Sequence, residues 1–122
     1  MPPRISSAEI DGHLPLKPLV FQVLLALTDA KRHGWSLVRE VQQRGGFSRI
    51  MPGNFYRTLR TMLAEGLIAE STSRGDQREE DERRRYFELT RLGEAVAGAE
   101  AARLEAAVVE ARAKRLLARS RG

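Results

Sequence analysis

The residues best suited to chemistry lie in the segment MPGNFYRTLRTMLAEGL, residues 51–67. Apolar residues recur there at the three- and four-residue spacing of one side of a helix. The other side carries four polar residues: Asn54, Arg57, Arg60 and Thr61. Guanidinium, amide and hydroxyl groups bind phosphates and the hydrogen-bonding edges of bases. Since no acid precedes Glu65, whereas solvent-facing helices usually pair acids with bases, this side predicts a DNA-binding surface.

Three residues around this helix have less certain roles. Arg49, in the segment before the helix, is expected to contact the DNA backbone. Tyr56 lies at the margin of the apolar side, so its hydroxyl either donates to a phosphate or belongs with the core. Asn54 either reads bases or caps a helix that starts after it, because the preceding Met51 cannot cap a helix. For Tyr56 and Asn54 both alternatives stay open.

A charged segment, SRGDQREEDERR, follows at residues 73–84 and contains no apolar residue. Such a segment must face water or a charged partner. Its acids EEDE are followed directly by RRR, and DNA repels an acidic tip. We therefore expect DNA contacts from Arg83, Arg84 or Arg85 at the base of the segment. An exposed loop whose charges neutralise one another is the alternative.

The elements that would position these residues follow in a simple order. The patterns predict three helices, two strands on either side of the charged segment, and a long last helix. The expected ranges are 18–30, 35–46 and 51–66 for the helices, 67–72 and 85–90 for the strands, and 91–119 for the last helix. This predicts a mainly α fold with a small β-hairpin wing: a winged helix-turn-helix domain at 18–90, preceded by an arm at 1–17.

The last helix is expected to form a dimer. Apolar residues repeat along it every seven residues, and a second apolar stripe lies on another side. Two apolar sides need two partners, and a second copy of the chain can be one of them. The residues expected at the interface are Leu92, Val96, Ala99, Ala102, Val109 and Leu116. A dimer would place two DNA-binding helices on an inverted repeat. A monomer with this helix folded back on its own domain is the alternative.

Composition excludes several other classes of protein. The 122 residues include 21 Lys and Arg against 16 Asp and Glu, for a net charge of +5, which suits a polyanionic partner. There is no cysteine and there are only two histidines, which argues against disulfides, thiol catalysis and the usual zinc sites. The sequence contains no nucleophile, paired-carboxylate or phosphate-binding motif, so neither an enzyme nor a cofactor is expected. No apolar run is long enough to span a membrane, so a cytoplasmic protein is expected.

Three motifs resemble the PadR-like transcriptional regulators, over about residues 16–117. They are LLALTDAKRHGWSLVREV, PGNFYRTLRTMLAEGLIAE and RRRYFELTRLGE. The resemblance implies a dimeric DNA-binding regulator, usually a repressor, that a small-molecule effector or another signal releases from DNA. The short C-terminal part looks like the subgroup with a single dimerisation helix. The alternative function is a winged-helix module that binds proteins, with the acidic EEDE segment as its contact surface.

Overall fold

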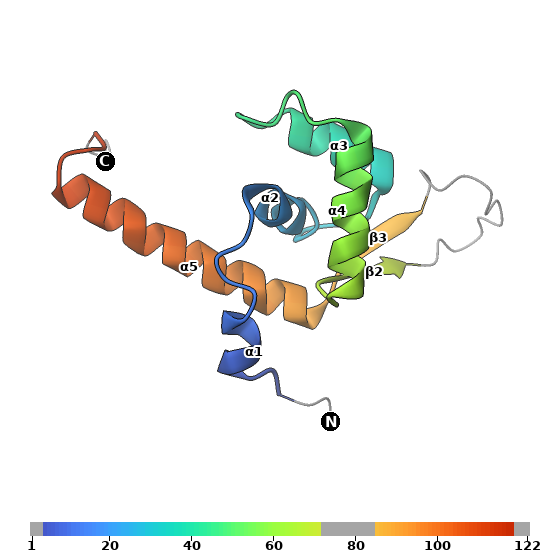
Figure 1. Cartoon of the computed structure of the whole chain (residues 1–122), viewed down its shortest axis with the longest axis horizontal. Helices are drawn as coiled ribbons and strands as arrows, with labels where there is room; N and C mark the ends of the chain where they lie inside the picture. Colours follow the sequence, from blue (N-terminus) through green and yellow to red (C-terminus); the bar gives the residue numbers. More distant parts are fainter. Residues whose placement is uncertain (1–3, 72–84, 119–122) are drawn as a thin grey trace.

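The computed structural model describes residues 4–71 and 85–118 (Figure 1). Its elements in chain order are α1 (Ser7–Asp11), α2 (Pro18–Ala26), β1 (Arg32–His33), α3 (Gly34–Gln42), α4 (Pro52–Ala64), β2 (Ile68–Ser71), β3 (Tyr86–Leu89) and α5 (Arg91–Ala113). The helices α2, α3 and α4 surround the core, and the small sheet closes one side of it. The long α5 packs on α2 and then projects beyond the domain. The expected mainly α, winged-helix fold is confirmed.

The sheet has one strand more than the predicted hairpin. Its strands are antiparallel in the order β1-β3-β2, with Arg32 opposite Phe87 and Ile68 opposite Leu89. The two predicted strands are β2 and β3, whereas β1 was read as a connection between helices. A strand of two residues is defined by its distant pairing partner, so it leaves no periodic pattern in its own sequence.

The core collects the apolar side of every long element. Its fully buried side chains come from α2, α3, α4, the chain entering β2, and α5: Val23, Leu24, Leu37, Val41, Phe55, Leu59, Met62, Leu67, Ile68 and Val96. On α4 the buried residues are Phe55, Leu59 and Met62, which is the predicted apolar side. Burial of this side leaves the polar side of α4 facing outward.

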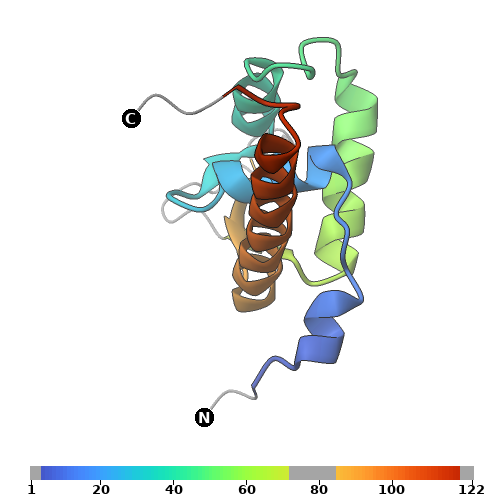
Figure 2. The ribbon, with the colours of Figure 1, turned by 90° about the vertical axis from the view of Figure 1, so that its left-hand side faces the viewer.

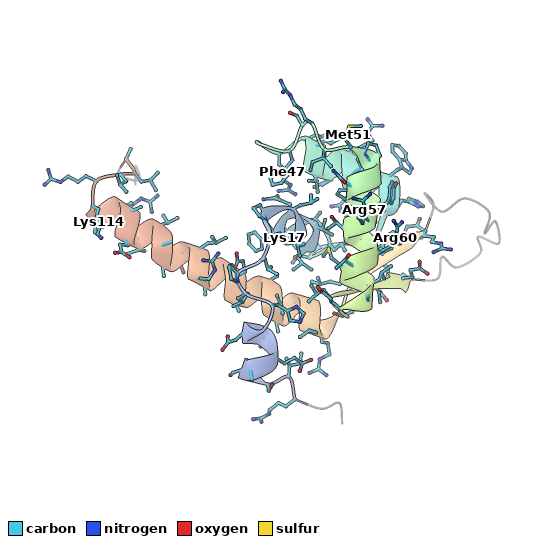
Figure 3. All side chains as sticks on the ribbon, viewed as in Figure 1. Lys17, Phe47, Met51, Arg57, Arg60 and Lys114 are labelled. Atoms are coloured by element: carbon cyan, nitrogen blue, oxygen red, sulfur yellow. The ribbon has the colours of Figure 1, made fainter. Side chains whose placement is uncertain are left out.

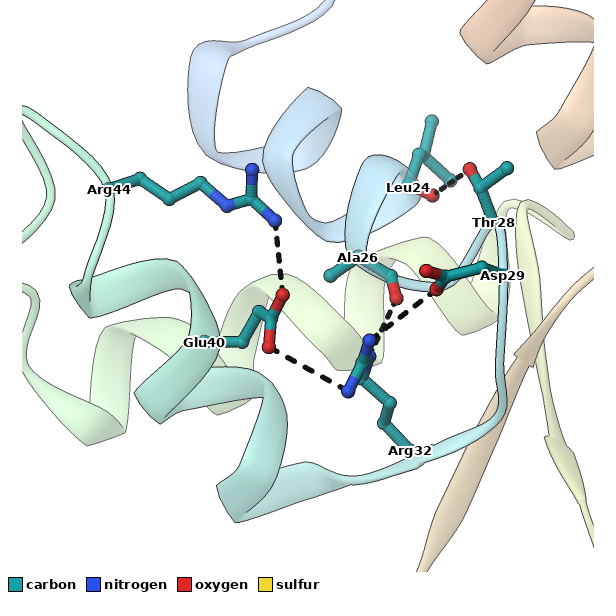
Figure 4. A network of polar contacts seen from close by, with 7 residues as sticks. All are labelled: Leu24, Ala26, Thr28, Asp29, Arg32, Glu40 and Arg44. Atoms are coloured by element: carbon teal, nitrogen blue, oxygen red, sulfur yellow. Dashed lines mark hydrogen bonds and ion pairs between the residues drawn. The ribbon is translucent and has the colours of Figure 1, made fainter.

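A polar network fixes the angle between α2 and α3 (Figure 4). The Arg32 Nε donates to the carbonyl oxygen of Ala26 at the end of α2, at 2.7 Å. The same guanidinium lies 3.4 Å from Asp29 and 3.7 Å from Glu40 of α3. A second arginine, Arg44, reaches the other oxygen of Glu40 at 3.3 Å. One arginine thus joins the end of α2 to α3, and α3 in turn packs against α4.

The N-terminal arm is docked on the domain. It contains the short helix α1, whose cap Ser6 accepts from the Glu9 N–H at 3.0 Å, and this helix lies against α5. Beyond it, Glu100 of α5 is only 2% exposed and accepts two hydrogen bonds of 2.8 Å from Arg103. Glu100 also accepts from the backbone N–H of Leu16 in the arm. This buried carboxylate therefore links the arm to α5.

The hydrogen bonds from Arg103 lower the pKa of Glu100 against the opposing effect of burial, and the Leu16 N–H adds to the lowering. A carboxyl whose pKa is lower in the folded state stabilises that state above its unfolded pKa. The stabilisation is lost as the pH falls through the folded pKa. The arm is therefore held most firmly near neutral pH, where Glu100 is ionised.

A membrane-spanning helix and a metal-binding cluster are two features that would indicate other classes of protein. Within 4–71 and 85–118, no helix combines the length and apolar character needed to cross a bilayer. The same two ranges hold no group of three or more histidine, aspartate or glutamate side chains placed to bind a metal ion.

Gly93, in the first turn of α5, allows the helix to approach the chain before β2. A Cβ there would overlap the carbonyl oxygen of Leu67, which is backbone and cannot rotate away. We expect Gly93→Ala to lower the free energy of unfolding by about 1 to 3 kcal/mol, as overpacking does. Urea unfolding measures this. Gly98→Ala is the matched control, because a Cβ at Gly98 meets nothing within 4 Å. It should raise stability by up to about 1 kcal/mol, and equal effects at both positions would contradict the packing argument.

Candidate nucleic-acid interface

The start of α4 resolves the question about Asn54. The helix begins at Pro52 with Met51 as its N-cap, and no side chain caps it. A proline suits this first position because its missing N–H would have no partner inside the helix. Asn54 therefore does not cap a later helix. Its Oδ1 accepts instead from the Arg57 Nη1 at 3.0 Å.

The outer side of α4 carries the predicted polar residues. Asn54, Arg57, Arg60 and Thr61 are all exposed. Figure 3 shows the side chains of Arg57 and Arg60 extending from this helix. Within the described parts of the chain, neither guanidinium forms an ion pair with an acid. The Thr61 hydroxyl donates to the Arg57 carbonyl oxygen at 3.2 Å, so its oxygen still accepts. This side offers donors for phosphates and base edges from one rigid helix.

The connection between α3 and α4 places one further arginine at the surface. Arg49 is exposed in this connection, whose end is fixed by a 3.1 Å hydrogen bond from Gln42 Nε2 to the Ile50 carbonyl oxygen. Arg44 is half-buried and paired with Glu40, so its charge is balanced inside the chain. The arginines exposed on α4 and on the connection before it are therefore Arg49, Arg57 and Arg60.

Tyr56 belongs to the core side of α4. Its hydroxyl oxygen is buried, and its ring packs edge-on against Phe55 with centroids 6.0 Å apart. The ring also lies against Gly34, where an added Cβ would stand 3.0 Å from Tyr56 Cε1. The burial of the hydroxyl favours the second of the two alternatives for Tyr56, that it belongs with the core.

On the wing side, Arg85 is exposed beside α4. Its Nη1 lies 2.7 Å from an oxygen of Glu70 on β2. Arg60, Glu70 and Arg85 line a shared hollow of about 160 Å³ between α4 and the sheet. Because an exposed ion pair of this kind is weak, a phosphate can compete with Glu70 for Arg85. Arg83 and Arg84, and the acidic EEDE segment, lie outside the described residues.

On the other side of α4, the structure adds a residue that the sequence did not single out. Lys17, the N-cap of α2, is exposed and lines the same hollow as Arg57 and Thr61 (Figure 3). Its neighbour Pro18, at the first position of α2, marks where the arm ends. Pro18 therefore shows in the sequence where the arm ends, but nothing in the sequence shows that the arm passes beside α4.

The residues expected to form a dimer separate into two groups. Val96 is completely buried in the core of its own chain and Leu92 packs against that core, so these two serve the protomer. Val109 is 60% exposed and Ala102 is exposed, while Ala99 is half-buried. Leu116 is also exposed, but α5 ends at Ala113. The helical repeat therefore does not extend to Leu116, and the last helix is shorter than the predicted range of 91–119.

The fold matches solved transcription regulators. A PadR family transcription regulator from Clostridium difficile gives a TM-score of 0.63 at 20% identity, over 84% of this chain and 100% of that one. A PadR-like regulator from Bacillus cereus gives 0.62 at 19% identity, over 93% and 100%. A transcriptional regulator from Clostridium thermocellum gives 0.60 at 16% identity, over 94% and 100%. At such identities the likeness concerns the fold.

Sequence comparison establishes the family. Curated proteins give no match. The model of the family described as "Transcriptional regulator PadR-like family" matches residues 23–99, more than half of the chain. That range holds β1, α3, α4, both strands of the predicted hairpin and the first turns of α5. It therefore includes the exposed side of α4 and every other described residue proposed to contact DNA. The chain belongs to the PadR-like family of transcriptional regulators.

Proposed function

We propose that the protein is a repressor that binds an inverted-repeat operator as a homodimer and leaves it in response to a small molecule or another signal. The observation that carries this proposal is the exposed side of α4, with two arginines, an asparagine and a threonine and no acid. An exposed polar helix side of this kind fits the major groove. Membership of the family supports DNA binding as the function of that side.

The exposed residues divide into two roles. Asn54 and Arg57 lie in the first two turns of α4, which enter the groove first in helix-turn-helix proteins, so we assign base contacts to them. Arg60 and Thr61 lie a turn later and can reach bases or phosphates. Arg49 before the helix and Arg85 on the wing side flank it, and we assign phosphate contacts to them.

The homodimer is supported by the free half of α5. Every residue from 101 to 110 is exposed, and this part of the helix extends away from the other elements (Figures 1 and 2). It carries large apolar side chains on two sides, with Leu104 36%, Val108 38% and Val109 60% exposed. Exposed apolar side chains gathered on one helix mark an interaction surface. In a two-fold symmetric dimer, the same residues of the second copy cover this helix. Such a dimer matches an inverted repeat whose half-site centres lie about 34 to 36 Å apart.

Gly53 provides a test that separates folding from binding. It lies in the first turn of α4, and a Cβ there meets nothing within 4 Å, so this chain does not itself require glycine. Alanine should therefore raise the free energy of unfolding by up to about 1 kcal/mol. If the helix start approaches a phosphate closely, the same Gly53→Ala change should weaken DNA binding by roughly tenfold. Unfolding in urea and fluorescence anisotropy with DNA measure the two effects. Gly98→Ala is the control. An unchanged DNA affinity in G53A would contradict a close approach of a phosphate to the start of α4.

The proposed function is tested by footprinting on the DNA upstream of the protein's own gene and by selection from random sites. A protected inverted repeat is expected. The affinity should fall by on the order of a thousandfold between 50 and 200 mM salt if the dimer neutralises six to ten phosphates. Absence of salt-sensitive protection in both experiments would overturn DNA binding. It would favour the alternative, a module that binds proteins.

A further inference from the structure

A hollow of about 350 Å³ lies between the N-terminal arm and α4, and we call it the arm pocket. One wall is formed by residues 12–20, from the end of α1 to the first turn of α2. The other wall is one side of α4, from Arg57 to Glu65. Its volume lies within the range of pockets that hold small organic ligands, roughly 300 to 1,000 Å³. It is separate from the exposed apolar half of α5.

The inner part of the arm pocket is apolar. Met62 is 1% exposed and belongs to the core. Leu16 and Val20, on the opposite wall, are half-buried and pack against the same core. A ligand that covers the exposed parts of Leu16 and Val20 gains the free energy of removing apolar surface from water, with the buried Met62 behind them. The pocket therefore favours a ligand with an apolar body.

The outer part of the arm pocket is charged and asymmetric. Lys17 and Arg57 supply two positive charges, and Glu65 supplies one negative charge. Within the described residues Lys17 forms no ion pair, and Arg57 uses one N–H on Asn54, which leaves the rest of its donors. The excess of one positive charge attracts an anion, while Glu65 opposes a ligand with several negative charges. The hydroxyl oxygens of Thr58 and Thr61 donate to backbone carbonyls and so can accept from the ligand.

We propose that the arm pocket binds an amphipathic organic anion with a single negative charge, and that the bound anion excludes DNA from α4. Arg57 and Thr61 line the pocket and also belong to the exposed side assigned to DNA. A ligand held by the Arg57 guanidinium occupies the donors that a base would use. Release from DNA is then direct competition on one surface. The second half of the proposal rests on the proposed function, and the first half does not.

The wall formed by the arm is held in place from behind. The Leu16 N–H donates to the buried carboxylate of Glu100, which two hydrogen bonds from Arg103 orient. The side chain of Leu16 lines the pocket while its backbone is bound to α5. The pocket therefore exists before a ligand arrives, which lowers the entropic cost of binding.

The experiment titrates naphthalene-1-sulfonate into the full-length protein without DNA and follows binding by calorimetry. Because both charged residues are exposed, their substitution leaves the fold intact. Lys17→Gln should weaken binding by about two- to fivefold, and Glu65→Gln should strengthen it by a similar factor. Lys114→Gln, an equal change of charge on an exposed lysine far along α5, is the matched control and should change nothing (Figure 3). Neutral 1-naphthalenemethanol and inorganic phosphate should both bind more weakly than the sulfonate.

Three results would overturn the proposal that the arm pocket binds the anion. The wild-type protein could fail to bind the sulfonate, K17Q and K114Q could change the affinity equally, or E65Q could bind the sulfonate more weakly than wild type. A second titration adds the sulfonate to the protein bound to its selected operator. In direct competition, the sulfonate concentration that releases half of the DNA should rise in proportion to the operator concentration once the operator is in excess of its dissociation constant. DNA affinity unchanged by saturating sulfonate would overturn the exclusion. Sulfonate binding with the expected charge dependence, in a protein that binds no DNA, supports the pocket and refutes the proposed function. A protein that binds its operator but does not bind the sulfonate would support the proposed function and refute ligand binding in the arm pocket.

Discussion

Replacing Arg57 by alanine should lower the affinity of the dimer for its operator by about 30-fold to 20,000-fold. A guanidinium that binds a base edge contributes about 1 to 3 kcal/mol of discrimination. The dimer uses two copies, and each 1.4 kcal/mol is a factor of about ten in affinity. Arg57 is exposed, and its described partner is the side chain of Asn54. The free energy of unfolding should therefore change by less than about 0.5 kcal/mol. Anisotropy titrations with the selected operator and with scrambled DNA measure the effect.

The comparison of two DNA sequences distinguishes a base contact from a phosphate contact. R57A should lose more affinity for the operator than for scrambled DNA, because a base contact carries sequence information. Arg49→Ala should weaken both by a similar factor and reduce the salt dependence by about one ion per protomer. Arg112→Ala removes the same charge from the exposed last turn of α5 and is the control. An R57A variant that binds both DNAs as wild type does would contradict the assignment of base contacts.

The sequence was informative where a local pattern determines structure. The spacing of Phe55, Leu59 and Met62 identified the buried side of α4. Gly66, whose φ is +78°, ends that helix as expected, because glycine adopts this conformation without steric cost. The exposed side of α4 could therefore be predicted almost completely. Each of these features depends on residues within one or two turns of one another.

The features that the sequence did not reveal depend on residues far apart. Tyr56 lies at the margin of its helix, and only the approach of Gly34 from α3 shows that its hydroxyl is buried. Glu100 is one of several glutamates on an alanine-rich helix, and only the docked arm distinguishes it from those that face water. Lys17 became part of the candidate site for the same reason. Long-range packing, which no periodicity records, determines all three.

The exposed half of α5 has the second large expected effect. Val109→Asp places a carboxylate on one of the two exposed apolar sides of α5, at a side chain that is 60% exposed in the single chain. If a second copy covers Val109, the charge loses its water on association, which costs several kcal/mol. The dimer should then dissociate at micromolar concentration. Sedimentation velocity measures the mass, and the single chain should remain folded because Val109 makes no part of its core.

Dissociation should also reduce binding to the inverted repeat by on the order of a thousandfold or more, because the second half-site no longer binds at high effective concentration. Lys114→Gln is the control at the end of α5. It changes the charge by one unit, as V109D does, at an exposed side chain on a different side of the helix from Val108 and Val109, and it should leave the dimer intact. Loss of the dimer in both variants would point to general charge repulsion instead of a specific interface. Wild-type protein that sediments as a monomer and still protects an inverted repeat would contradict α5 as the dimer contact, because the symmetry of the site would then come from the DNA alone.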